Sequence, residues 1–136
     1  MPKQYLIRLV AREDNTVEAT NEHGARVVMG SSGPEHFSPV ELLLAALGGC
    51  AGMDFVDLMA KQRDPLAEVV LEVTAERAPD REQRLAWARV TYRVAVEGDT
   101  GRKVERARRA IPMSTCTVSR TLVHSCPVEH VVQPPG

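Results

Sequence analysis

The order of elements along this chain predicts an α+β fold, because its strands and helices do not alternate as a repeated βαβ unit. Three strand-like stretches come first, at residues 5–10, 16–20 and 25–29, separated by turn residues. A long apolar helix, two long strands, two further helices and a last strand at residues 128–132 follow. A chain of 136 residues suits one domain, spanning residues 1–136.

The strongest local signal is a helix start at Ser38. Ser38 can cap the helix, Pro39 takes the first helical position and Glu41 the third, which is a capping box. We expect this helix to run to about Gln62. It is apolar on nearly every side between Leu42 and Leu47, so it should be buried.

The rest of the chain supplies one small sheet and two more helices. Residues 67–77 and 87–96 alternate apolar and polar side chains and predict two long strands. A second helix should start near Gly98 and end at Pro112, and a short third helix should cover residues 116–123. One small sheet cannot cover a helix that is apolar all round, so we expect a homodimer.

Composition excludes several classes of protein. With 43% hydrophobic residues, 26% charged residues and a net charge of −1, the chain has no general attraction to nucleic acid or to an anionic membrane. The longest apolar stretch, Leu42–Met53, is too short to span a bilayer. No secretory signal is visible at the N-terminus, and three cysteines without framework spacing do not form a secreted disulfide scaffold. We therefore expect a cytoplasmic protein.

Cys50 lies within the long helix and is flanked by Gly48, Gly49 and Gly52. Each glycine costs helix stability, and small neighbours leave room for a substrate or another chain segment. A small core residue is the alternative interpretation of this cysteine. Glu41 is nine residues away, which is about 13 Å along a helix axis and nearly opposite in angle, so capping explains it better than pairing with the thiol.

Cys116 is expected in the first turn of the third helix, where the helix dipole and unpaired N–H groups stabilise a thiolate. A buried first-turn residue is the alternative there, and Cys126, before Pro127, is expected to be structural. Cys116, His124, Cys126 and His130 could bind metal, but their spacing does not match structural zinc sites, so zinc is the weaker alternative. No catalytic triad order, phosphate loop or dinucleotide fingerprint is present in the sequence, and we expect no cofactor.

Residues 38–50, SPVELLLAALGGC, together with residues 116–122, CTVSRTL, resemble the OsmC/Ohr family of osmotically inducible and organic hydroperoxide resistance proteins. The resemblance covers essentially the whole chain. It implies an OsmC-like fold, with antiparallel sheets around a long buried central helix, and an intertwined homodimer with active sites at the subunit interface. It also implies a thiol-dependent peroxidase of oxidative stress defence. Cys50 would be the peroxidatic cysteine, Cys116 the resolving one, an organic hydroperoxide the substrate and a lipoyl-type dithiol the reductant.

The chain departs from the peroxidase members at two points. They place a Glu directly after the proline, where this chain has Val40 and then Glu41, and they use that Glu to hold an Arg over the thiolate. Arg26 is the candidate for this Arg and Arg8 the reserve, so the expected catalytic set is Cys50, Cys116, Arg26 and Glu41. The second motif is Cys-Thr rather than the common Cys-Pro, which places the chain closer to the OsmC-like branch. A non-enzymatic dimeric protein that binds an apolar ligand is the alternative.

Overall fold

The computed structural model describes residues 2–79, 83–95, 97–113 and 117–135. They form two compact units, Met1–Leu43 and Leu44–Gly136, and each is described here by itself. Each unit contains one three-stranded sheet, and the helices confirm the predicted α+β class. The expectation of a single domain stays a prediction.

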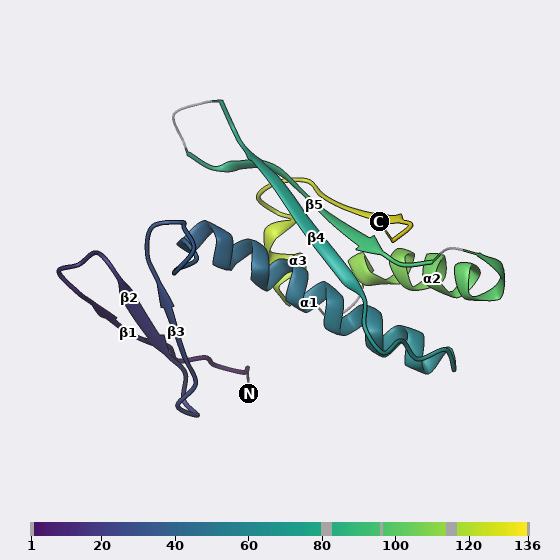
Figure 1. Ribbon diagram of the computed structural model, residues 1–136, viewed down its shortest axis with the longest axis horizontal. Coiled ribbons are helices and arrows are strands. Elements are labelled where there is room, and N and C mark those ends of the chain that lie inside the picture. The colour runs from purple at the N-terminus through teal and green to yellow at the C-terminus, as the bar shows by residue number, and fades with distance from the viewer. Residues whose placement is uncertain (1, 80–82, 96, 114–116, 136) are drawn as a thin grey trace. The chain divides into compact units, whose positions relative to one another are not determined.

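The N-terminal unit is an antiparallel meander in which the central strand pairs with both neighbours (Figure 1). Pairing of the first two strands begins at Arg8 opposite Thr20, and the chain then turns between Asn21 and Gly24. Residues 5–7, expected in the first strand, therefore have no opposite residues in the second. The strands are β1 (Arg8–Ala11), β2 (Val17–Thr20) and β3 (Arg26–Met29).

This small sheet buries very little of its apolar surface. Among the described residues of the unit, Ala19 alone is a buried hydrophobic residue. Leu9 is 55% exposed and Val28 is 38% exposed, although both lie within strands. A sheet of this size needs apolar cover to be stable.

The C-terminal unit holds most of helix α1, which begins at Pro39 and ends at Lys61, one residue short of the predicted end. Its sheet has the order β4-β5-β6. Strands β4 and β5 are antiparallel, as expected, but β6 runs parallel to β5 because two helices intervene and carry the chain back across the sheet. The elements are β4 (Val70–Arg77), β5 (Leu85–Arg93), α2 (Gly98–Ala110), a 3₁₀ turn (Ile111–Met113), α3 (Thr117–Leu122) and β6 (Val128–Gln133).

The core of this unit lies between one face of the sheet and the helices. Alternate residues of β5 point to that face, and one stripe of α1 and the inner side of α2 pack against them. Figure 1 shows where α1, α2 and the strands β4 and β5 lie in this unit. The fully buried members include Leu47, Phe55, Tyr92 and Val104.

Helix α1 is therefore buried along one stripe only within the single chain. Its buried residues are Leu47, Ala51, Phe55 and Met59, whereas Met53 is 77% exposed. The expected all-round burial is not met by this chain alone, because the sheet and α2 contact only one side of the helix. By length and composition α1 could also cross a membrane, but the core helix of a globular protein passes the same test.

Candidate functional site

Cys50 lies near the middle of α1, is half-buried and is disulfide-bonded. Cys126 is in contrast a free, buried thiol just before β6, in agreement with the structural role expected of it. Cys116, the expected resolving cysteine, lies outside the described residues.

An apolar groove of about 700 Å³ runs beside the segment that carries Cys50. Gly49 precedes the cysteine and Gly52 follows it, and both line the groove together with Met53, Val56 and Leu71. Gly48, which also lines the groove, allows α1 to approach β4 closely. A Cβ at Gly48 would lie 2.8 Å from Cγ2 of Val73, which is shorter than real carbon contacts, so the close packing at this point requires glycine.

Glu41 is fully engaged at the start of α1. The backbone N–H of Ser38 donates to Glu41 Oε1 at 2.8 Å, and the Ser38 hydroxyl accepts from the Glu41 N–H at 3.2 Å, which confirms the predicted capping box. The Ser32 hydroxyl donates to the other carboxylate oxygen at 2.8 Å. These hydrogen bonds, first that from the Ser38 N–H, lower the pKa of Glu41. Both carboxylate oxygens of Glu41 therefore accept hydrogen bonds from the Ser38 N–H and the Ser32 hydroxyl at the start of the helix, not from an arginine side chain.

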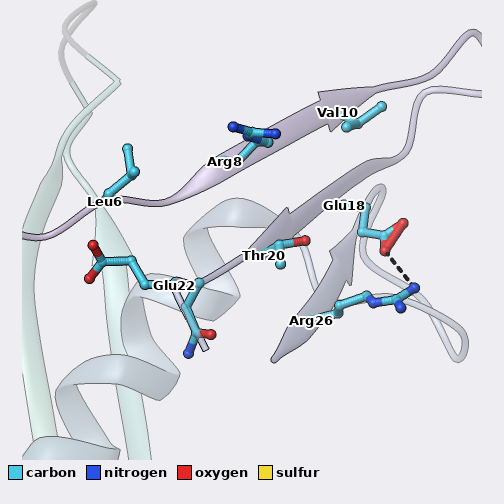
Figure 2. Close-up of a pocket in the computed structure, with 8 residues that line it drawn as sticks. Leu6, Arg8, Val10, Glu18, Thr20, Glu22 and Arg26 are labelled. Atoms are coloured by element: carbon cyan, nitrogen blue, oxygen red, sulfur yellow. Dashed lines mark ion pairs between the residues drawn. The ribbon is translucent and has the colours of Figure 1, made fainter. Parts of the chain in front are cut away.

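Arg26 and Arg8, the candidates for the activating arginine, line a hollow of about 530 Å³ on one face of the N-terminal sheet (Figure 2). Figure 2 shows Arg26 reaching toward Glu18, with Nη1 3.6 Å from Oε1. Arg12 also donates to Glu18, at 2.6 Å, and this bond is the main cause of the lowered pKa of Glu18. Arg26 and Cys50 belong to different units, so their expected cooperation stays a prediction.

Sequence reasoning missed a buried polar pair behind α1. The Tyr92 hydroxyl lies 2.7 Å from Nδ1 of His130, Tyr92 is fully buried and His130 is nearly so. Burial, then the Asp54 charge, raises the pKa of Tyr92. Burial, then the Arg108 charge, lowers the pKa of His130. Both side chains are thus neutral at pH 7, and the phenol donates to the imidazole.

The sequence predicts the strands that carry Tyr92 and His130 but not the contact between the two side chains. Tyr92 and His130 each lie within a predicted strand, but their contact depends on the parallel register of β5 and β6, in which His130 lies opposite Val90. Arg108 of α2 donates to the carbonyl oxygen of His130 at 3.3 Å.

Metal binding gains no support from the described residues. Within residues 2–79, 83–95, 97–113 and 117–135, no three His, Cys, Asp or Glu side chains gather where they could hold a metal ion.

Comparison with known proteins agrees with this arrangement of elements. Residues 31–131 match the family described as OsmC-like protein. The chain belongs to the OsmC-like family. Protein YhfA of Escherichia coli K12 is 28% identical over 113 residues, which cover 79% of this chain and 81% of YhfA.

Solved structures share the fold over nearly the whole chain. A hypothetical protein from Aquifex aeolicus VF5 superposes with a TM-score of 0.82 at 17% identity, covering 98% of this chain and 97% of that one. An organic hydroperoxide resistance protein OsmC from Legionella pneumophila superposes with a TM-score of 0.66 at 13% identity, covering 97% and 99%. At these identities the likeness extends to the fold.

Proposed function

We propose that this OsmC-like protein reduces organic hydroperoxides with a pair of cysteines, Cys50 as the peroxidatic residue and Cys116 as the resolving one. The observation that carries the proposal is a disulfide-bonded Cys50 beside an apolar groove. The free, buried state of Cys126 supports Cys116 as the second member of the pair. Family membership and the fold shared with a protein named for organic hydroperoxide resistance support the substrate class.

The chemistry follows from the two thiols. The Cys50 thiolate attacks one peroxide oxygen, the O–O bond breaks, the alcohol leaves with a proton, and Cys50 becomes a sulfenic acid. The Cys116 thiol then condenses with the sulfenic acid, which gives a disulfide and water. A dithiol of the lipoyl type returns both cysteines to thiols by exchange and is itself oxidised to a disulfide.

The groove favours alkyl peroxides over hydrogen peroxide. Its lining includes Met53, Val56, Val69 and Leu71, and apolar side chains bind the hydrocarbon part of a peroxide by removing its surface from water. Asp57 and Glu68 are the charged members of the lining.

We infer further that the working protein is a homodimer. Met53 of α1 and Val70 of β4 are 77% and 56% exposed, and Leu6 and Val10 of the N-terminal unit are 62% and 52% exposed. Apolar surface of this extent is covered in stable proteins, and a second copy of the chain is the simplest cover. Sedimentation at micromolar concentration should give a dimer, and a monomer there would contradict the inference.

The function is tested by counting thiols after one equivalent of cumene hydroperoxide is added to the reduced protein. We expect the loss of two thiols in the wild type and in Cys126→Ser, the matched control. Cys50→Ser should lose none, and Cys116→Ser should stop at a sulfenic acid on Cys50. If the wild type keeps all its thiols, the peroxidase proposal is wrong and binding of an apolar ligand becomes the better account of the groove.

Activation of Cys50 should differ from that in the peroxidase members, since Glu41 is engaged in the capping box and Val40 stands at the family's Glu position. We expect slow oxidation by alkyl peroxides and faster oxidation in Val40→Glu, with the gain lost when Arg26→Ala is added. Single-turnover oxidation of the wild type, Val40→Glu and the double variant across pH measures these rates. Oxidation rates that are the same in all three proteins would refute the assigned role of Arg26.

A further inference from the structure

The apolar groove lies between α1 and the start of β4, and the two elements run in opposite directions along it. A Cβ at Gly48 would lie 2.8 Å from Cγ2 of Val73, and one turn later a Cβ at Gly52 would lie 3.4 Å from Cδ1 of Leu71. A strand advances about 3.3 Å per residue and a helix about 1.5 Å. Glu68, three residues before Leu71, is therefore level with the part of α1 about two turns after Gly52.

The charged lining of the groove gathers at this same end. Asp57 follows Cys50 by seven residues, so it lies on the same side of α1, about 10 Å further along the helix axis. Asp57 and Glu68 both line the groove. The groove therefore has the cysteine beside one end and two carboxylates at the other.

The carboxylate end keeps a negative charge when its ion pair is included. Lys61 pairs with Asp57 at 2.9 Å, and the two side chains are 70% and 61% exposed. Carboxylates are ionised at pH 7, so the two carboxylates and the one ammonium group leave one negative charge. An exposed ion pair is screened by water and is weak, and Glu68 is exposed as well.

A long peroxide bound in the groove would reach this end. With its O–O bond at Cys50, its hydrocarbon tail would extend past Met53 and Val56 toward the two carboxylates. The length of about 10 Å is spanned by about eight extended carbon–carbon bonds. A tail of this length that ends in a carboxylate would bring a like charge to the negative end, whereas an uncharged tail would not.

We propose that Asp57 and Glu68 select hydroperoxides whose hydrocarbon tail ends without a negative charge, such as the esters of fatty acid hydroperoxides, over the corresponding free carboxylates. The inference rests on the proposed function, since it names the substrate class of the same groove. Like charges about 8 Å apart, in a dielectric of about 40–80, repel by an energy equivalent to about two- to sixfold in binding. Both residues lie away from the reacting atoms and determine specificity.

The first test measures binding to the reduced, full-length protein without a peroxide, so it is independent of the proposed reaction. Octanoate, 1-octanol and octylammonium share one hydrocarbon chain and differ in charge. Each is titrated against the neutral fluorescent probe N-phenyl-1-naphthylamine, and displacement of the probe gives the Kd. The Kd of 1-octanol measures the apolar groove alone, so the Kd of each charged ligand is divided by that of 1-octanol.

The variants separate the charge at the groove from charge elsewhere. Glu68→Gln should lower the octanoate ratio by about two- to sixfold and raise the octylammonium ratio, and Asp57→Asn should act in the same direction. Glu76→Gln is the matched control, because it removes an exposed carboxylate near the other end of β4 and should leave both ratios unchanged. Unchanged ratios in Glu68→Gln, or an equal change in Glu76→Gln, would overturn the inference, as would a failure of 1-octanol to displace the probe.

The second test is single-turnover oxidation by the 9-hydroperoxide of linoleic acid and by its methyl ester, both below the concentration at which they aggregate. The wild type should react faster with the ester, and Glu68→Gln should narrow the difference by about two- to sixfold. Equal wild-type rates with the two peroxides would refute the proposed selectivity and leave the peroxidase function standing. If the Kd ratios change as expected while neither peroxide oxidises Cys50, the selectivity of the groove stands and the proposed function fails.

Discussion

Substituting Gly48 by Ala tests the closest approach of α1 to β4. The added Cβ would lie 2.8 Å from Cγ2 of Val73, whereas carbon atoms pack best at about 3.5–4.0 Å. Valine is stiff at χ1, so its methyl group cannot rotate away cheaply and the helix must shift instead. Overpacking of this kind costs about 1–3 kcal/mol.

Replacing a helical glycine also removes a conformational cost. Alanine gains about 1 kcal/mol over glycine within a helix. The net effect of Gly48→Ala is then a loss of about 0–2 kcal/mol, taking the two contributions as additive. Gly52→Ala is the matched control, because its Cβ would meet Cδ1 of Leu71 at 3.4 Å, an ordinary contact. That variant should gain up to about 1 kcal/mol.

Urea denaturation of both variants, in one redox state and at one protein concentration, measures the difference in the free energy of unfolding. We expect Gly48→Ala to be less stable than Gly52→Ala by about 1–3 kcal/mol, with similar urea dependence. A cycle with Val73→Ala should reduce the cost of Gly48→Ala, because that substitution removes the clashing methyl group. Equal stabilisation by both alanines, or a cost unchanged by Val73→Ala, would refute the packing described for this face.

Two further predictions concern the helix cap and the buried histidine. Ser38→Ala removes the acceptor for the Glu41 N–H and should lower the free energy of unfolding by about 1 kcal/mol, and a Ser38→Asp variant that is no more stable than Ser38→Ala would contradict the capping role. The folded pKa of His130 lies below its ordinary value of 6.5, so its stabilising contribution is complete above pH 6.5 and is lost as the pH falls through the lowered pKa. Denaturation from pH 7 to 5 should show this loss in the wild type and a flatter profile in His130→Gln, and equal slopes would exclude His130 as the cause.

Local patterns predicted the elements of this fold closely. The capping box placed the start of α1 at Pro39, and alternation located β4 and β5 to within a few residues at each end. Such signals depend on residues that are close in sequence. In the capping box, a serine oxygen accepts a hydrogen bond from the amide three residues later, and in a strand, successive side chains alternate between the two faces. The direction of β6 was less accessible, because it depends on how far α2 and α3 carry the chain before it returns to the sheet.

In the candidate site, too, contacts between residues close in sequence could be predicted, whereas contacts between distant segments could not. Glu41 could be placed in the helix cap by its spacing from Ser38. The neutral Tyr92–His130 pair could not be placed from sequence, because its residues are 38 positions apart and meet only when β5 and β6 adopt their parallel register.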